Sequence, residues 1–101
     1  MANYRLSNTA KEDLIRIHQF TLNQFGEVQA DKYIAAFFHH FEIIASKPNA
    51  FEAVDSIRKG YRRCICGSDS IFYRIQINTV EIMAIVGRKD LDQLFRFKIT
   101  H

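Results

Sequence analysis

The chain has 101 residues, of which 48% are hydrophobic, 13% aromatic and 25% charged. Such a length and composition are typical of one globular domain, so we expect a single domain over residues 1–101. No apolar run approaches the ~20 residues that a membrane-spanning helix needs, and the N-terminus has no apolar signal core. Two cysteines exclude a disulfide scaffold. The sequence therefore predicts a soluble, cytoplasmic protein.

The chain begins with a short strand, predicted over residues 4–7, and continues into a helix. Thr9 and Glu12 fit a capping box at the helix start, and Ser7 and Asn8 are also competent caps. Apolar or small residues then recur at steps of three and four, which is the period of one helix face. This face consists of Ala10, Leu14, Ile17, Thr21 and Phe25.

A second helix is predicted from about Glu27 to Ser46. Gly26 is suited to cap the first helix, and Pro48 ends the second. The short junction at Gly26 predicts an antiparallel helical hairpin. The apolar face of the second helix consists of Ala30, Ile34, Phe37, Phe38, Phe41, Ile44 and Ala45.

After a connector over residues 49–60, the apolar pattern changes to a period of two. Strands are predicted over residues 61–66, 71–77 and 80–86, separated by turn signals. In the middle strand, one face consists of Ile71, Tyr73, Ile75 and Ile77. Three such strands form an antiparallel meander. The predicted fold is thus α+β: a short N-terminal strand, an antiparallel two-helix hairpin and a three-stranded meander, with the second sheet face free to bind a partner.

Charge is distributed unevenly along the chain. Residues 1–57 carry five Lys/Arg and seven Asp/Glu, a net charge of −2, whereas residues 58–101 carry nine Lys/Arg and four Asp/Glu, a net charge of +5. This asymmetry is compatible with ordinary solvating charges. It is equally what a surface for an acidic partner would show, whether nucleic acid or an acidic protein segment.

Few residues are arranged for chemistry. Cys64 and Cys66 share one strand face and are interpreted as packing residues, since no second Cys/His pair has zinc spacing. Phosphate-binding loops and nucleophile elbows are absent from the sequence, and we expect no metal or other cofactor. One catalytic option is RNA cleavage by a basic sheet face, with Tyr61 or Tyr73 as the proton-transfer group, although strand tyrosines more often serve packing. Its cations would be Arg62, Arg63, Arg74, Arg88 and Lys89.

Six short motifs follow one another over about 90 residues of the chain. The motifs are Tyr4-x-Leu6-Ser7-x-x-Ala10-x-x-Asp13-Leu14-x-x-Ile17, Gly26-x-x-Gln29-Ala30-x-x-Tyr33, Ala45-x-x-Pro48, Ile57-Arg58-x-Gly60-Tyr61-Arg62, Gly67-Ser68-Asp69-Ser70-Ile71-Phe72-Tyr73-Arg74 and Gly87-Arg88-Lys89-Asp90. In this order they resemble the RelE/ParE superfamily of bacterial toxins, and within it the ParE branch.

The resemblance implies the toxin of a type II toxin–antitoxin system. ParE-like toxins inhibit DNA gyrase, whereas RelE-like toxins cut mRNA on the ribosome. The RelE pattern has an arginine that falls on Ser70 or Ile71 here, and a C-terminal tyrosine that falls on Phe95. Phe95 has no hydroxyl for proton transfer. These two departures favour a non-catalytic gyrase inhibitor, with a ribosome-dependent endoribonuclease as the alternative.

The same resemblance implies two sets of contact residues. We expect a ParD-like antitoxin and DNA gyrase, through its A subunit, as partners, with no sequence-specific DNA binding and no membrane. The expected target-binding residues are Arg62, Arg63, Arg74, Arg88, Lys89, Asp92, Phe95 and Arg96. The expected antitoxin-binding residues, on the exposed sides of the two helices, are Ile15, Phe20, Leu22 and Tyr33.

Overall fold

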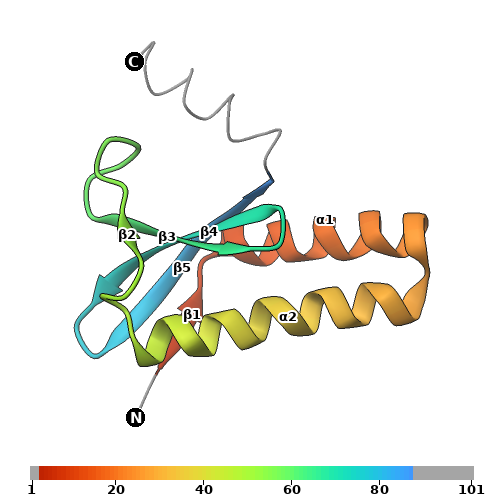
Figure 1. Cartoon of the computed structure of the whole chain (residues 1–101), viewed down its shortest axis with the longest axis horizontal. Coiled ribbons are helices and arrows are strands. Elements are labelled where there is room, and N and C mark those ends of the chain that lie inside the picture. Colours follow the sequence, from red (N-terminus) through yellow and green to blue (C-terminus); the bar gives the residue numbers. More distant parts are fainter. Residues whose placement is uncertain (1–2, 88–101) are drawn as a thin grey trace.

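A computed structural model describes residues 3–87 of the chain. Within this range, two helices lie side by side on one face of a five-stranded sheet of order β1-β5-β4-β3-β2 (Figure 1). The α+β class, the helical hairpin and the antiparallel meander β3-β4-β5 are confirmed. The elements are β1 (Tyr4–Leu6), α1 (Asn8–Phe25), α2 (Glu27–Ser46), β2 (Glu52–Ala53), β3 (Tyr61–Cys66), β4 (Asp69–Gln76) and β5 (Thr79–Gly87).

The edges of the sheet were not predicted in full. β1 pairs in parallel with β5, so that Tyr4 lies opposite Val80. The predicted connector contains the two-residue strand β2, which pairs antiparallel with β3. Neither pairing has a local sequence signal, because one joins the two ends of the described chain and the other involves only two residues.

Helix α1 begins two residues earlier than a cap at Thr9 would place it. The Ser7 hydroxyl, not that of Thr9, accepts the N-terminal cap bond from the backbone N–H of Ala10 at 3.0 Å. The same hydroxyl donates to the carbonyl of Met83 in β5 at 2.8 Å. A tertiary contact with the sheet therefore selects Ser7 among the local candidates.

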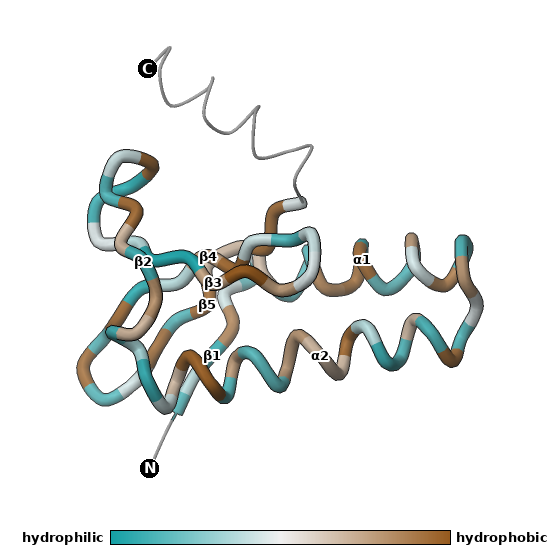
Figure 2. The backbone as a smooth tube through the Cα atoms, viewed as in Figure 1, coloured by the Kyte–Doolittle hydropathy of each residue, from teal (hydrophilic) through white to brown (hydrophobic). Residues whose placement is uncertain are grey.

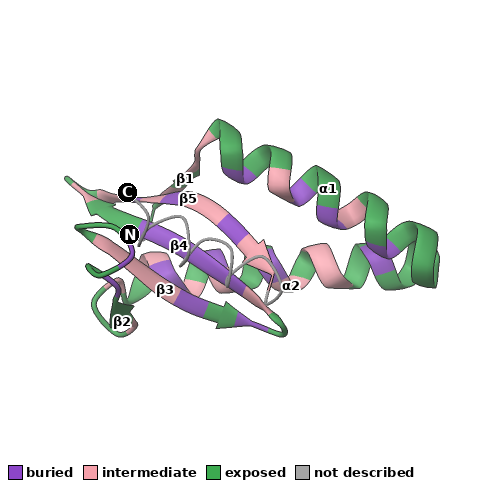
Figure 3. Ribbon diagram, turned by 90° about the horizontal axis from the view of Figure 1, so that it is seen from above, coloured by how far each residue is buried: buried purple, intermediate pink, exposed green. Residues whose placement is uncertain are grey.

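Gly26 joins the two helices with φ of 91°, a conformation that favours glycine. Its N–H donates to the carbonyl of Leu22 and its carbonyl accepts from the N–H of Ala30, both at 3.0 Å. One residue thus ends α1 and begins α2. The hairpin extends beyond the sheet (Figures 1 and 3), and its last turns carry the exposed side chains of Phe25 and Val28.

The main core lies between the helices and the sheet face that they cover, which we call the inner face. Apolar and polar residues alternate along both helices, and buried residues gather in the three central strands (Figures 2 and 3). The fully buried side chains of Phe37 and Phe41 contribute from α2, and those of Ile71, Tyr73 and Ile82 from the sheet. Four of the predicted face positions are wrong. Phe25 is 68% exposed, since it lies past the sheet, and Ile77 is 90% exposed, since β4 ends at Gln76. Phe38 and Ile75 are 39% and 43% exposed.

The opposite, outer face of the sheet is not wholly free, contrary to the prediction. Val54 and Ile57, from the segment between β2 and β3, pack on Phe72 of β4 to form a second, smaller core, flanked by Tyr61 and Val86. A register shift between Phe72 and Tyr73 accompanies this change, and the two neighbouring residues contribute to different cores. Within residues 3–87, neither helix is long and apolar enough to cross a lipid bilayer.

Candidate partner-binding surfaces

A groove of about 950 Å³ lies between the helical hairpin, the β3–β4 turn and the end of β5. We call it the hairpin groove. Its apolar wall carries Phe20 and Phe25, which are 63% and 68% exposed. Large apolar side chains left this exposed at the edge of a groove are typical of a binding surface. The remaining lining residues are Arg16, Ile17, Thr21, Gln29, Tyr33, Ser68, Asp69 and Gly87.

The polar end of the hairpin groove is held by a bond between α2 and the β3–β4 turn. The hydroxyl of Tyr33 donates to the carboxylate of Asp69. Burial, followed by this bond to Asp69, raises the pKa of Tyr33 to about 12. The turn passes close to the ring: a Cβ at Gly67, where φ is 62°, would lie 3.6 Å from the Tyr33 hydroxyl oxygen. The groove therefore has a fixed polar end and an open apolar end.

The predicted antitoxin-binding residues are only partly brought together. Phe20 and Tyr33 both line the hairpin groove. Ile15 and Leu22, which are 60% and 39% exposed, lie on α1 but not in the groove lining. Tyr33 is half-buried against the main core, so its assignment to an exposed helix side was wrong. Helical periodicity indicates which positions lie off the buried face. It does not indicate which side of the hairpin the β3–β4 turn covers.

Arg62 and Arg63, predicted as one basic patch, lie on opposite faces of the sheet because adjacent strand residues alternate. Arg62 lies on the inner face and donates to the carbonyl of Phe51 at 2.6 Å. Arg63 lies on the outer face, where both its Nε and an Nη atom donate to Glu52 of β2. Both guanidinium groups thus hold the β2 segment against β3.

Arg74 belongs to an ion-pair network on the outer face. Its Nε and Nη2 atoms donate to Glu81 at 3.0 and 2.8 Å, and Arg5 lies 3.8 Å from the same carboxylate. The network joins β4, β5 and β1. Arg88, Lys89, Asp92, Phe95 and Arg96, the other predicted target-binding residues, lie outside the described residues.

The two tyrosines considered for proton transfer occupy different environments. Tyr73 is fully buried, and its hydroxyl donates to the carbonyl of Pro48 at 2.6 Å. Burial raises the pKa of Tyr73 to about 12, although Arg62 acts in the opposite direction. Tyr61 lies on the outer face beneath the guanidinium of Arg58, 5.7 Å from the ring centre. Tyr73 therefore serves the core, as the packing interpretation predicted.

The cysteines and histidines of the described chain form no chemical centre. Cys64 and Cys66 share one strand face, as predicted, and both are buried there. Burial raises the pKa of Cys64 to about 11. Across residues 3–87, no three His, Cys, Asp or Glu side chains gather closely enough to hold a metal ion.

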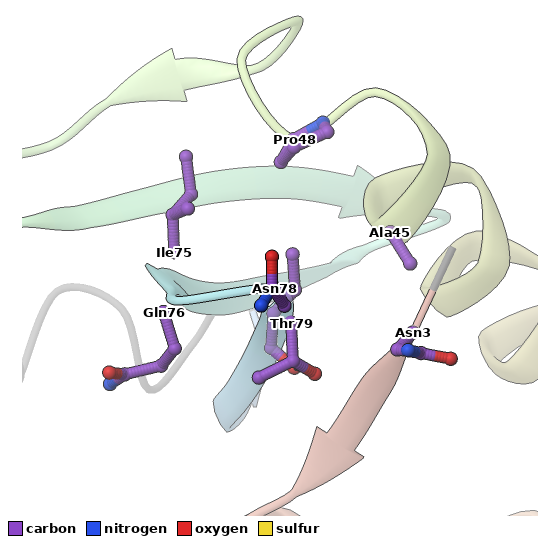
Figure 4. A pocket seen from close by; sticks show the side chains of 8 residues that line it. Asn3, Ala45, Pro48, Ile75, Gln76, Asn78 and Thr79 are labelled. Atoms are coloured by element: carbon purple, nitrogen blue, oxygen red, sulfur yellow. The ribbon is translucent and has the colours of Figure 1, made fainter. Parts of the chain in front are cut away.

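A second hollow, of about 470 Å³, lies at the opposite end of the molecule, between the end of α2 and the β4–β5 turn (Figure 4). Asn3, Gln76 and Asn78 bring amide groups to it, and Ile75 and Pro48 bring apolar surface. Its lining residues include no charged side chain. It therefore lacks the mixture of exposed aromatic and ionic groups that the hairpin groove presents.

One structural carboxylate was not anticipated. Asp13 accepts from the backbone N–H of Ile85 at 2.9 Å through one oxygen and contacts Arg16 at 3.2 Å through the other. It ties α1 to β5 near the hairpin groove. The available sequence signal was the position of Asp13 directly before Leu14, which belongs to the buried face of the helix. A residue at this position lies at the border of the buried face, closer to the sheet than a fully solvent-exposed residue would be.

Comparison with known proteins identifies the family. A family model described as the ParE toxin of the type II toxin–antitoxin system, parDE, matches residues 4–92. The chain belongs to this family. It is 37% identical over 86 residues to Toxin ParE1 of Caulobacter vibrioides, which covers 85% of this chain and 88% of that protein. It is 32% identical over 94 residues to Toxin ParE1 of Mycobacterium tuberculosis, with 91% and 96% covered.

Solved structures share the fold. A chain in the structure of the chromosomal ParDE system from P. aeruginosa aligns with a TM-score of 0.76 at 18% identity, covering 86% of this chain and 96% of that one. A chain in the RelBE2 toxin–antitoxin complex from Mycobacterium tuberculosis aligns with a TM-score of 0.61 at 20% identity, covering 86% and 98%. The ParE and RelE branches thus share one scaffold, and the fold alone does not choose the target.

Proposed function

We propose that this ParE-family protein is a non-catalytic toxin that acts in the cytoplasm by binding DNA gyrase, through the A subunit, and that a ParD-like antitoxin neutralises it. Membership of the ParE family supports the gyrase target. The observation that carries the non-catalytic proposal is the placement of the sheet arginines. Arg62 and Arg63 lie on opposite faces, and their guanidinium groups bind acceptors of the same chain.

Cleavage of RNA requires cations aimed at one phosphate and a group that moves a proton. In the described sheet, Arg74 binds Glu81, and Tyr73 is buried with its hydroxyl bonded to Pro48. Ser70 and Ile71, the positions on which an arginine of the RelE pattern falls, are both buried. These contacts favour inhibition by protein binding over phosphodiester chemistry.

For the antitoxin, the exposed apolar side of the helical hairpin is the supporting feature. Phe20 and Leu22 on α1 present apolar surface to solvent, as does Ile15. Tyr33 joins this surface at the groove. An amphipathic segment that folds on binding would bury such residues, which is a common mode of recognition. The two structural neighbours come from systems described as ParDE and RelBE, each pairing a toxin with an antitoxin.

The decisive experiment is supercoiling of relaxed plasmid by gyrase with the purified full chain. We expect loss of supercoiling and accumulation of linear DNA, because a toxin bound to gyrase would hold the enzyme on broken DNA. Arg96→Ala should weaken the effect at least several-fold. Lys32→Ala, which removes an exposed cation of α2, is the matched control and should leave it unchanged.

Absence of inhibition by protein with a folded circular dichroism spectrum would reject the gyrase proposal. Ribosome-dependent mRNA cleavage by that same preparation would then establish the endoribonuclease alternative, with Arg62→Ala and Arg63→Ala as the variants to compare. If neither activity is found, the non-catalytic toxin proposal fails as a whole.

A further inference from the structure

Ile77, in the turn between β4 and β5, has the most exposed large apolar side chain among residues 3–87, at 90%. Gln76 pairs with Thr79, so Ile77 and Asn78 are the two central residues of this hairpin turn. Asn78 supplies a positive φ of 61°, which asparagine tolerates in such turns. Neither the geometry of the turn nor the packing of the core therefore explains an isoleucine at position 77.

An apolar hollow adjoins this turn. Gln76 and Asn78, the residues on either side of Ile77, both line the hollow of about 470 Å³ at the end of α2 (Figure 4). Its apolar lining includes Pro48 and Ile75, and Ile75 is 43% exposed. A volume of this size is typical of pockets that receive a ligand, so it can accept an aliphatic side chain. An exposed isoleucine and a hollow that could receive one thus lie next to each other, and we call the two together the turn face.

The polar groups of the turn face suit contact with an identical surface. The hollow is lined by no charged side chain, and its polar residues are Asn3, Gln76, Asn78 and Thr79. An amide or a hydroxyl both donates and accepts hydrogen bonds, so it can bind the same group of a second copy, whereas two like charges repel. A two-fold axis places a surface against its own copy. The chemistry of the turn face is therefore compatible with such pairing.

The two other exposed apolar surfaces described above suit self-pairing less well. The hairpin groove is lined by Arg16 and Asp69 as well as by its phenylalanines. The outer face around Ile65 carries the ion pairs of Arg63 and Arg74. Pairing of two copies through either surface would remove ionic groups from water, which costs desolvation energy. Among these surfaces, the uncharged hollow beside Ile77 carries no such cost.

We propose that two copies of this chain pair through the turn face, with Ile77 of each copy packed in the hollow of the other. Because the isoleucine and the hollow are adjacent, one two-fold axis forms both contacts. The contact is small, so the dimer is a weak one that dissociates on dilution. The hairpin groove lies at the opposite end of the molecule and stays accessible, so the dimer does not depend on the proposed function.

The test is analytical ultracentrifugation of the purified full chain over about 1 μM to 1 mM, a range that spans weak association. We expect a reversible monomer–dimer equilibrium. Ile77→Asp should lower the association constant more than about tenfold, because a symmetric interface contains the change twice and each carboxylate meets an apolar hollow. Raising the salt concentration should not weaken the dimer, since no ion pair holds it.

Two matched controls carry the same substitution on other surfaces. Ile65→Asp, at a side chain 60% exposed on the outer face, should leave the association constant unchanged. Phe25→Asp, at 68% exposure on the helical hairpin, should also leave it unchanged. If either control dissociates the dimer and Ile77→Asp does not, the copies pair elsewhere and the proposal is wrong. Circular dichroism establishes that every variant is folded.

A complementation experiment tests the contact itself. Ala45→Gln fills the hollow from α2 with a residue that favours helices, and it should weaken the dimer as Ile77→Asp does. A mixture of the two variants should associate more strongly than either variant alone, because Ile77 of one copy then meets the open hollow of the other. Loss of stability cannot produce such a recovery.

A mixture that associates no better than its components would show that Ile77 does not enter the hollow. A wild-type chain that stays monomeric over the whole concentration range would equally overturn the proposal, and any occupant of the turn face would then be a different molecule. Neither result would bear on the gyrase proposal, since no gyrase enters the measurement.

Discussion

The inner and outer faces of the sheet are built from different contacts. The inner face is covered by two helices and buries large side chains completely, among them Phe37, Phe41 and Tyr73. The outer face has one small apolar cluster around Phe72 and otherwise carries arginines paired with Glu52 and Glu81. Burial is worth far more than exposed ion pairs, so stability should come from the inner face. Outside the cluster around Phe72, the outer face can then vary at little cost to the fold.

The largest expected effect comes from the centre of the inner face. Phe37→Ala should lower the free energy of unfolding by about 3–5 kcal/mol, because Phe37 is fully buried and the cavity cannot close. Phe38→Ala, at the next position but 39% exposed, should cost clearly less. Urea unfolding of both variants measures the difference. Equal losses in the free energy of unfolding would mean that the burial of the two phenylalanines does not determine how much each contributes to stability.

A second prediction concerns the bond that joins α1 to the sheet. Asp13→Ala leaves the backbone N–H of Ile85 without its acceptor and should cost about 1–3 kcal/mol. Asp13→Asn keeps an acceptor oxygen and should cost less, while Glu12→Ala, at an exposed neighbour, should change little. Chemical denaturation would contradict the role of this bond if Asp13→Asn were as destabilised as Asp13→Ala.

A third prediction uses pH to isolate the buried hydroxyl of Tyr73. Its pKa is raised from 10.0 to about 12, so the folded state holds the proton more tightly than the unfolded state. Its contribution to stability is therefore complete below pH 10 and is lost as pH rises from 10 towards 12. Tyr73→Phe should cost about 1 kcal/mol at neutral pH, through the bond to Pro48, and should lose less stability at alkaline pH.

Tyr33 titrates in the same range, so the difference between wild type and Tyr73→Phe is the quantity to measure. Urea unfolding at pH 8 and at pH 11 provides it. An identical alkaline loss in both proteins would show that the Tyr73 hydroxyl does not govern this part of the pH dependence.

The smallest expected effect lies on the outer face. Arg74→Ala should change the free energy of unfolding by less than about 1 kcal/mol, since the side chain is 45% exposed and its pair with Glu81 is screened by water. A double-mutant cycle with Glu81→Ala measures the coupling of the pair. If the coupling energy of Arg74 and Glu81 were as large as the destabilisation by Phe37→Ala, the conclusion that stability comes from the inner face would be wrong.

Periodicity predicted much of this fold. The steps from Ala10 to Thr21 located the buried face of α1, and the alternation in residues 61–66 placed Cys64 and Cys66 on one face of their strand, which the structure shows to be buried. Periodicity failed where tertiary contacts determine the helix cap or the exposure of a side chain. Ser7 caps α1 because it also binds Met83 in β5. Phe25 is exposed because the hairpin extends past the sheet. Local sequence patterns do not encode contacts with residues that are distant in the chain.

The candidate sites were harder to predict than the fold. Charge along the chain suggested a basic patch, but alternation separates Arg62 from Arg63, and acids of the same sheet bind Arg63 and Arg74. The apolar residues of the helix surface were easier to locate, because Phe20 lies off the buried stripe. The groove beside it depends on how the β3–β4 turn packs against Tyr33, which no local pattern encodes.

The parallel pairing of β1 with β5 has a consequence for how the protein is made. Tyr4 and Leu6 find their partners only in Val80 and Ile82, so the sheet cannot close until almost the whole described chain has left the ribosome. A growing chain that lacks β5 also lacks the buried side chains of Val80, Ile82 and Ile85. Synthesis therefore imposes a delay before the sheet can close, and the parallel pair is among the last contacts that the growing chain can make.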